Sequence, residues 1–305
     1  MTSIPRGIAN LRYLKILDLF HNQLTTIPYE LFDLKDLKEL YLRDNPLSLP
    51  PEIVDKSNQP SIIFEYFKTI QTGFLQPLHE AKIVLVGQGS VGKTSLVKRL
   101  IHNQFDLYES KTEGIAIERY STQVAAGEIK LHVWDFGGQE IMHATHQFFL
   151  TKRTLYLLVL DARLGQEENR VEYWLKLIKS FGANSPIIIV GNKSDQQHLD
   201  IDKRGLQKKY PTIRRFIDTS CLRGDGIDDL KDVIANEIEN LPHIHDMLPK
   251  RWFDIKEKLG LMKKDYISYN EYVTLCNRRG IDDSNAQRTL IGFLHDLGVI
   301  LEFQR

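Results

Sequence analysis

Residues 87–94 read GQGSVGKT, and they constrain the fold of this chain more than any other feature. The stretch fits the pattern GxxxxGK[ST] and lies between an apolar run at 82–86, typical of a buried strand, and a helical segment at 95–101. Glycines let successive backbone N–H groups turn inward, and the start of the helix adds unpaired N–H groups and partial positive charge. We therefore predict an α/β sheet with a phosphate-binding loop (P-loop), rather than a chance glycine turn before a helix.

Two side chains of this loop would act on a nucleotide directly. Lys93 would reach the β- and γ-phosphates, and the Thr94 hydroxyl would hold Mg²⁺. The backbone and small side chains of the other positions would surround the phosphates. The predicted nucleotide contacts of the loop are Gly87, Gly89, Ser90, Val91, Gly92, Lys93, Thr94 and Ser95.

The loop at 192–195 (NKSD) predicts which base is bound. It follows an apolar run at 186–191, typical of a parallel strand buried on both sides, and open α/β sheets bind ligands at the carboxyl ends of such strands. Asp195 would accept two N–H bonds from the guanine edge, whereas adenine would leave that carboxylate unpaired. Lys193 would lie along the base, and Asn192 would tie the loop to the P-loop. We therefore expect GTP and GDP as ligands rather than ATP.

A third motif, DFGGQE at 135–140, follows an alternating, strand-like run at 129–134. Asp135 would hold Mg²⁺ through a water molecule, the N–H of Gly138 would meet the γ-phosphate, and Gln139 would orient the attacking water. The simpler alternative is a strand-end aspartate before a plain Gly-Gly turn. The P-loop upstream favours the nucleotide role.

Two weaker elements complete the set. Thr112 lies before a strand expected at 115–121, where a threonine can close over Mg²⁺ when the γ-phosphate is present, although Ser110 and Thr122 are nearby hydroxyls. The segment TSCL at 219–222 follows the last strand-like run, and a plain strand-to-helix turn would look similar. The residues of that segment expected to offer backbone N–H groups to the guanine oxygen are Ser220, Cys221 and Leu222.

In this order the five elements resemble those of the Ras-like GTPases. The motif at 135–140 with the HATHQFF run at 143–149 is similar to the Roc domain (Ras of complex proteins), which typically lies between leucine-rich repeats and a COR domain. Both flanks are visible, so the chain resembles the Roco family, and nothing kinase-like is present in it. The resemblance implies an α/β fold with a mixed six-stranded sheet and helices on both faces, Mg²⁺-dependent GTP hydrolysis, and homodimerisation through COR.

The upstream flank is repetitive. The pattern LxxLxxLxLxxNxL that begins at Leu11 recurs 23 residues later at Leu34, and Pro28 maps to Pro51. This period is the signature of leucine-rich repeats, in which leucines fill the interior and an asparagine bonds the backbone. A partial unit at 4–8 brings the total to about two and a half repeats, where about three are needed for stability. We therefore expect the chain to begin within a longer array, and the repeats could bind a protein partner.

The segments around the P-loop domain are less strongly patterned. Residues 61–70 have apolar positions at helical spacing, which predicts a helix that caps the repeats and abuts the P-loop domain, with Pro60 in its first turn. A membrane-surface helix is the rival interpretation, but the segment lacks a basic face. After residue 248 we expect three helices and a strand at 298–303, which form a winged-helix-like unit similar to the start of a COR domain and truncated at the end of the chain.

These patterns predict four segments. They are leucine-rich repeats at 1–57, a connecting helix at 58–79, a GTPase domain at 80–242 and the N-terminal part of COR at 243–305.

Composition limits the function classes. Lys and Arg total 40 and Asp and Glu total 40, so no basic excess offsets nucleic-acid phosphates, and the winged-helix pattern does not predict DNA binding. Two cysteines, Cys221 and Cys276, favour a reducing compartment without a disulfide framework. No segment approaches about 18 consecutive apolar residues, and no signal peptide or lipidation motif is visible. We expect a cytoplasmic protein without a membrane segment.

The expected reaction is in-line attack of water on the γ-phosphorus, which needs positioning and charge neutralisation more than covalent chemistry. A nucleotide-bound dimerisation scaffold with little turnover is one alternative, and a P-loop ATPase, disfavoured by Asp195, is another. No arginine in the switch loops is an obvious finger in cis. Arg163, at the ligand edge, could assist hydrolysis across a dimer or be a solvated loop residue. The predicted catalytic residues are Gln139, Lys93 and Thr112, and the predicted metal-site residues are Thr94, Thr112 and Asp135.

Overall fold

The computed structural model describes residues 1–47, 49, 53–54, 58–72, 74–110, 112, 114–125, 127–137, 150–262, 264 and 266–300. The chain forms two compact units. One unit contains Met1–Leu78 and His245–His295, and the other contains His79–Ile244 with residues 296–300. We call the first the flanking unit and the second the nucleotide unit.

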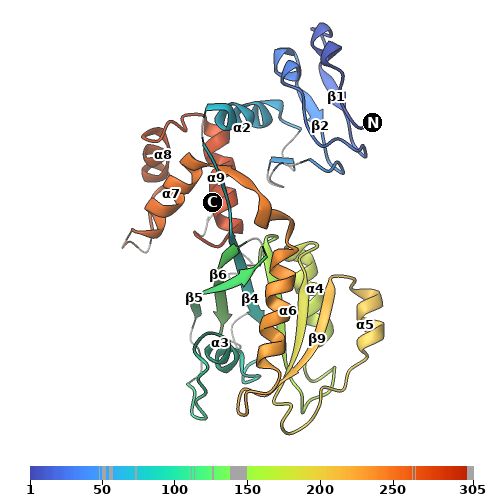
Figure 1. The fold of residues 1–305 in the computed structure, drawn as a ribbon, viewed down its shortest axis with the longest axis vertical. Helices are drawn as coiled ribbons and strands as arrows, with labels where there is room; N and C mark the ends of the chain where they lie inside the picture. Colours follow the sequence, from blue (N-terminus) through green and yellow to red (C-terminus); the bar gives the residue numbers. More distant parts are fainter. Residues whose placement is uncertain are drawn as a thin grey trace. The chain divides into compact units, whose positions relative to one another are not determined.

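A mixed six-stranded sheet forms the centre of the nucleotide unit, as predicted (Figure 1). The strand order is β5-β6-β4-β7-β8-β9, and all neighbours are parallel except the β5–β6 pair. The strands are β4 (Glu80–Val86), β5 (Ile115–Val124), β6 (Gly127–Phe136), β7 (Thr154–Asp161), β8 (Ile187–Asn192) and β9 (Ile213–Thr219).

Helices cover both faces of this sheet, because successive side chains of its central strands point to opposite sides. On β4, Ile83 and Leu85 pack in the cluster that contains Leu96, whereas Val84 and Val86 pack in the cluster of the other face. The first cluster includes residues of α3 (Lys93–His102) and α6 (Ile227–Glu239), and the second includes residues of α4 (Val171–Gly182) and α5 (Lys203–Lys209). Burial of each such side chain contributes about 1.5–3 kcal/mol, so the two cores hold the strand ends rigidly.

The repeats at the start of the chain form a short parallel ladder. Strand β1 (Ile16–Asp18) pairs with β2 (Glu39–Tyr41), and Leu17 lies opposite Leu40, which is the register of a 23-residue period. Each strand follows a 3-10 turn, η1 (Arg6–Asn10) or η2 (Tyr29–Asp33). Asn45 bonds the backbone as predicted, since its Nδ2 donates to Leu19 O at 2.8 Å.

The leucines of the two repeats are not equally buried. Leu34 and Leu40 are buried, but Leu11, the counterpart of Leu34, is 52% exposed. A repeat buries its leucines only against a neighbouring unit, and Leu11 lacks such cover here. The prediction that leucines fill the interior is therefore wrong at Leu11.

The connecting helix is present as α2 (Pro60–Thr72), with Pro60 as its first residue. Phe64 of this helix lies 4.8 Å from Phe32 of the second repeat, measured between ring centroids, so α2 contacts the repeats. A short strand follows, β3 (Leu75–Pro77), which pairs antiparallel with β10 (Met247–Pro249). The sequence did not predict this pair, because three-residue strands that contain proline carry no periodic signal.

Three helices form the rest of the flanking unit: α7 (Lys250–Gly260), α8 (Tyr269–Asn277) and α9 (Ser284–Asp296). A capping box between Ser268 and Glu271 starts α8. A 3-10 turn, η4 (Pro242–His245), precedes β10. Within the part of the chain that the structure describes, no helix combines the length and apolar character needed to cross a membrane.

The strand expected at 298–303 is not formed at 298–300, which are turn and bend residues, and 301–303 lie outside the described residues. Gly298 has a φ of +73°, which turns the chain, and a Cβ there would lie 3.0 Å from atoms of Lys82 and Trp134. Residues 298–300 therefore form a turn rather than the start of the expected strand.

Candidate nucleotide site

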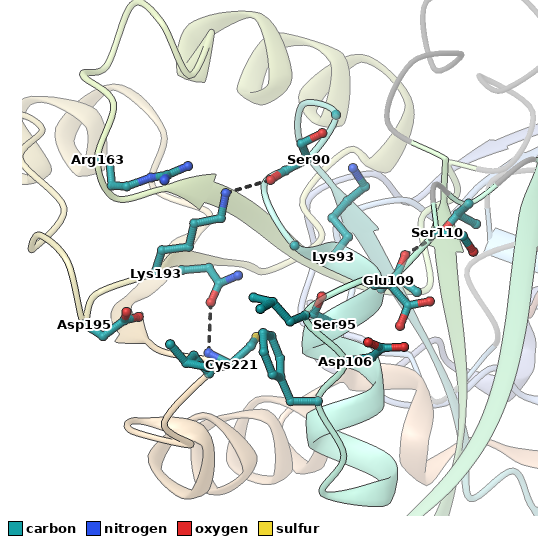
Figure 2. A pocket seen from close by; sticks show the side chains of 18 of the residues that line it. Ser90, Lys93, Ser95, Asp106, Glu109, Ser110, Arg163, Lys193, Asp195 and Cys221 are labelled. Carbon is teal, nitrogen blue, oxygen red and sulfur yellow. Dashed lines mark hydrogen bonds between the residues drawn. The ribbon is translucent and has the colours of Figure 1, made fainter.

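A cavity of about 730 Å³ opens at the carboxyl ends of β4, β6 and β8, the edge where open α/β sheets bind ligands. Its walls come from the P-loop and the start of α3, the segment 105–112, the end of β6, and the loops after β7, β8 and β9. Figure 2 shows Arg163, Lys193 and Asp195 on one side of this cavity and Glu109 and Ser110 on the other. Among the predicted residues, Gly87, Val91, Asp135 and Ser220 lie behind the cavity wall.

Glycine is required at two P-loop positions by close packing. Gly87 has a φ of +142°, and a Cβ on it would lie 2.1 Å from the carbonyl oxygen of Val159. Gly92 has a φ of +94°, and its Cβ would lie 2.3 Å from Nδ2 of Asn192. Side chains at either position would therefore push the P-loop away from its supporting strand or from the base loop.

Lys93 is held inside the P-loop. Its Nζ donates to the carbonyl oxygens of Gly87 at 3.0 Å and Gln88 at 2.8 Å. Burial lowers the pKa of Lys93 to about 8, against a smaller opposite effect from the Asp135 carboxylate. The ammonium is therefore an incompletely compensated buried charge, which a phosphate would stabilise.

Three side-chain oxygens converge beside Lys93. Oγ1 of Thr94 lies 2.5 Å from Oδ2 of Asp135 and 2.5 Å from Oγ1 of Thr112, and Oγ1 of Thr112 lies 3.5 Å from that carboxylate oxygen. The other carboxylate oxygen, Asp135 Oδ1, is buried and has no hydrogen-bond partner among the described residues. Burial raises the pKa of Asp135, and the hydrogen bond from Thr94 opposes this.

This donor set fits Mg²⁺. Hydroxyl and carboxylate oxygens are the ligands Mg²⁺ takes, and it keeps several water molecules that a free buried carboxylate oxygen can bind. Asp135 Oδ1 matches the predicted contact through water, and the two threonine hydroxyls match direct ligands. The residues present therefore suit the ion that the sequence implied.

The Thr112 hydroxyl lies beside Thr94 and Asp135, and its role at the metal stays a prediction. Ser110 lines the cavity, and Thr122 lies on β5 opposite Ile129, away from the cavity wall. Gly137 supports the position of Thr112, since a Cβ on Gly137 would lie 2.3 Å from the Thr112 carbonyl oxygen, and its N–H donates to Gly114 O at 3.0 Å. Gly137, just after β6, is thus packed backbone to backbone against Thr112 and Gly114.

The base loop after β8 is tied to the P-loop by two side chains. Asn192 Nδ2 donates to Val91 O at 2.9 Å, as predicted from its position. Lys193 Nζ donates to Ser90 O at 2.8 Å, so its stem crosses the cavity edge (Figure 2). Asp195 Oδ1 accepts a hydrogen bond from Ser220 Oγ at 2.6 Å, which fixes the carboxylate that would read guanine.

The segment after β9 is arranged differently from the prediction. The N–H of Ser220 donates to Asp225 O at 3.0 Å, and the N–H of Cys221 donates to Asn192 Oδ1 at 3.3 Å. Two of the three N–H groups expected to face a guanine oxygen are thus used within the protein. Ser220 instead contributes its hydroxyl to Asp195, while Cys221 and Leu222 line the cavity. Burial raises the pKa of the Cys221 thiol to about 12, so it is not a nucleophile near neutral pH.

Sequence reasoning missed three residues of the site. Arg99 on α3 donates from Nε to Cys221 O at 2.7 Å and from Nη2 to Leu222 O at 3.1 Å, which fastens that loop to the helix. Phe105 lines the cavity with an aromatic ring. Asp161, at the end of β7, accepts from Lys193 Nζ at 2.7 Å. None of the three belongs to a recognisable motif, and their roles depend on partners far away in the sequence.

Three further predicted positions are Arg163, Gly138 and Gln139. Arg163 lines the cavity but donates to the Asp161 carboxylate and to Gln196, so it does not project freely toward a second copy of the chain. Its use as a finger across a dimer stays a prediction that this geometry does not favour. Gly138 and Gln139, the expected γ-phosphate and water contacts, lie outside the described residues.

The P-loop, the converging oxygens of Thr94, Thr112 and Asp135, and the loop after β8 on a mixed sheet define a Ras-like P-loop domain. The family profile described as Ras of Complex, Roc, domain of DAPkinase matches residues 82–195. The profile described as C-terminal of Roc, COR-A domain matches 249–305, and a leucine-rich-repeat profile matches 1–47.

Individual relatives agree with these profiles. A solved structure titled Methanosarcina barkeri Roco2 RocCORdC bound to GDP is 44% identical, covers 79% of this chain and 73% of its own, and has a TM-score of 0.72. This chain belongs to the Roco family. The probable serine/threonine-protein kinase pats1 of Dictyostelium discoideum is 29% identical over 93% of this chain, and a Roc-COR-CHAT protease of Runella zeae is 29% identical over 90%.

This chain spans only a fraction of these two proteins. It covers 10% of the Dictyostelium protein and 32% of the Runella protein.

Proposed function

We propose that this chain binds GTP and GDP with Mg²⁺, hydrolyses GTP to GDP and phosphate, and acts as a nucleotide-dependent switch in a Roco-type multidomain protein. The observation that carries the proposal is the meeting of three groups around one cavity. These groups are the P-loop lysine Lys93, the oxygens of Thr94, Thr112 and Asp135, and the Asn192–Asp195 loop. GDP in the related Methanosarcina structure supports the choice of nucleotide.

The phosphate end of the site would act through charge. Lys93 would exchange its bonds to the Gly87 and Gln88 carbonyls for bonds to the β- and γ-phosphate oxygens. Mg²⁺, when bound, would neutralise charge on the same oxygens, and Thr94, Thr112 and Asp135 are the residues that would hold it. Gln139 is proposed to orient the attacking water. Chemistry of this kind depends on positioning and charge stabilisation rather than on a covalent intermediate.

The base end of the site would act through hydrogen-bond matching. The Ser220 hydroxyl holds one oxygen of Asp195, which leaves the carboxylate oriented before a base arrives. Guanine offers an N1–H and a 2-amino group to a carboxylate, and a base without them would leave the carboxylate unpaired at a cost of about 1–3 kcal/mol. The loop therefore favours guanine over adenine.

The switch would reside in the segment around Thr112, which here means residues 105–110, 112 and 114. We call it the Thr112 segment. Thr112 contacts Thr94 and Asp135 through its hydroxyl and packs through its carbonyl against Gly137. A γ-phosphate with its metal would hold this arrangement, and its loss on hydrolysis would release both segments. Nucleotide chemistry would in this way change the surface formed by residues 105–110, 112 and 114.

The proposal extends to the assembly through the family resemblance. We propose homodimerisation of the full-length protein through COR, a protein partner on the repeats, and a cytoplasmic location. The segment boundaries at 57, 79 and 242 stay a prediction.

The test of the proposed function is competition between nucleotides for the purified chain. GTP and GDP should displace a fluorescent GDP analogue, whereas ATP should not, and chelation of Mg²⁺ should weaken GTP binding more than GDP binding. Equal competition by ATP would contradict the base assignment. Tight GTP binding without turnover would favour a dimerisation scaffold over an enzyme.

A further inference from the structure

The carboxylate of Asp161 joins two cations at the base side of the cavity. It accepts from Arg163 Nη2 at 2.7 Å and Nε at 2.9 Å, and from Lys193 Nζ at 2.7 Å. Asp161 is only 4% exposed, so these bonds form in a setting where charges interact more strongly than in water. Burial alone would raise the pKa of Asp161, but the bonds from Arg163 and Lys193 outweigh it and lower the pKa to about 2. The carboxylate is therefore ionised at any physiological pH.

The loop that carries this pair is built around a buried asparagine. Asn169, 1% exposed, donates from Nδ2 to the carbonyl oxygens of Asp161, Leu164 and Gly165 at 2.8–3.1 Å. Its Oδ1 accepts from the N–H of Asp161 at 2.9 Å. The loop after β7 is thereby fixed by protein contacts alone, and Asp161 is presented in one orientation.

Arg163 extends this connection to the guanine-reading segment. Its Nη1 donates to Oε1 of Gln196 at 3.2 Å, and Gln196 follows Asp195 directly. Arg163, Lys193, Asp195 and Gln196 all line the cavity, and Figure 2 shows Arg163 next to Lys193 on the side of Asp195. The Arg163 side chain is 44% exposed, but its bidentate bonds to a buried carboxylate and its bond to Gln196 hold it in one position.

We propose that Asp161 and Arg163 form a positioning pair for guanine recognition. Asp161 fixes the ammonium of Lys193, whose aliphatic stem would then lie along the plane of the base. Arg163 holds the Asp195–Gln196 segment so that the Asp195 carboxylate faces the edge of the base. The inference rests on the proposed function, because it concerns the same nucleotide site. Apart from each other, the side chains of Asp161 and Arg163 bond to Lys193 and Gln196, in and beside the base loop, so the pair should affect base choice and retention rather than the chemical step.

The experiment compares dissociation constants for GDP and inosine diphosphate, which lacks the 2-amino group that Asp195 would bind. The full chain and its Arg163→Ala, Arg163→Lys, Gln196→Ala and Asp161→Asn variants are measured by displacement of a fluorescent GDP. Lys208→Ala, which removes one positive charge from the exposed surface of α5, is the matched control. Thermal unfolding of each variant identifies any that fail to fold.

Arg163→Ala should lower the preference for GDP over inosine diphosphate by about three- to tenfold, which corresponds to part of one charged hydrogen bond. Gln196→Ala should lower it less, and Arg163→Lys should restore it only in part, because an ammonium cannot bind both carboxylate oxygens and Gln196 at once. Asp161→Asn should weaken GDP binding about tenfold. The Lys208→Ala control should keep the base preference of the unmodified chain.

Two results would overturn the proposal that Asp161 and Arg163 position the base-binding residues. One is an unchanged base preference in Arg163→Ala and Gln196→Ala. The other is a loss of hydrolysis in Arg163→Ala with base preference intact, which would assign Arg163 to the phosphate chemistry. If Asp161→Asn does not fold, the Arg163 and Gln196 variants decide. Failure of the unmodified chain to bind GDP would instead remove the proposed function itself, so the two failures are distinguishable.

Discussion

At the scale of single residues, the ionisation of Lys93 links nucleotide binding to pH. Burial lowers the pKa of Lys93 in the free protein to about 8, and bound phosphate should raise it again. Between these two values the bound form holds one more proton than the free form. GDP affinity should therefore fall as pH rises through 8, by about tenfold between pH 7 and pH 9.

Calorimetry in buffers of different ionisation enthalpy would detect the accompanying proton uptake at pH 8–9. Lys93→Met should bind GDP weakly at every pH and lose this proton uptake. A pH-independent affinity across this range, or uptake that persists in Lys93→Met, would show that another group titrates.

At the same scale, Asp195 is the residue proposed to set the base preference. Asp195→Asn replaces one acceptor oxygen by an amide donor, which should repel the guanine N1–H and 2-amino group and tolerate the additional oxygen of xanthine. We expect GTP to bind at least about tenfold more weakly, with relative improvement for xanthosine triphosphate. Displacement titrations with both nucleotides provide the measurement. Unaltered guanine preference in this variant would mean that the 192–195 loop does not read the base.

At the scale of structural elements, the contact between the end of β6 and the Thr112 segment should be sensitive to one methyl group. A Cβ at Gly137 would lie 2.3 Å from the Thr112 carbonyl oxygen, so backbone must shift in Gly137→Ala. Displacement of a catalytic position by about 1 Å can cost about 100-fold in rate. We expect single-turnover GTP hydrolysis to fall at least about tenfold while GDP affinity changes little.

Gly260→Ala is the matched control for this change, because a Cβ at Gly260 in α7 meets open space. Equal hydrolysis rates in the Gly137→Ala variant and the unmodified chain would show that the Thr112 segment is not coupled to β6 during the reaction.

Comparing helices, strands and loops with the sequence shows which of them could be predicted and why. The apolar run at 187–190 and the alternation at 129–134 gave the correct strands, because hydrophobic period reports burial directly, and the mixed six-stranded sheet is confirmed. The P-loop and the NKSD loop could be located because their chemistry needs contiguous residues. Asp161 and Arg99 could not, since their partners lie 32 and 122 positions away along the chain.

Other features of the site differ from the sequence predictions for local reasons. Thr112 could not be separated from Ser110 by sequence, because the choice depends on which hydroxyl the loop presents to Thr94. At 219–222 the sequence could not show that the N–H groups of Ser220 and Cys221 would find partners within the protein. The roles of Gly138 at the γ-phosphate and of Gln139 at the attacking water stay predictions.

At the scale of the whole molecule, the two compact units should respond differently to nucleotide. GDP binds only the nucleotide unit in this account, and a ligand at 100 times its dissociation constant stabilises a folded domain by about 2.7 kcal/mol. For a unit of this size the shift in unfolding temperature should be about 5–10 °C. Hydrogen exchange with and without GDP would assign the protection to residues within 79–244 or to the flanking unit.

The expected outcome is strong new protection in β4, α3 and the loops after β8 and β9, with little change in the repeats. Equal stabilisation of the flanking unit would show that the two units unfold as one. Protection absent from the P-loop would place the nucleotide elsewhere.

The central claim is that this pocket selects GTP and hydrolyses it, and one measurement tests it most directly. The purified chain is mixed with GTP and ATP in the presence of Mg²⁺. The two nucleotides are equimolar, and their concentrations are below that of the protein. Bound nucleotides are then separated and quantified over time. The account predicts that GTP is retained and converted to GDP, that ATP is neither retained nor hydrolysed, and that chelation of Mg²⁺ stops the conversion. Retention of ATP alongside GTP, or GTP that stays intact on the protein with Mg²⁺ present, would contradict it.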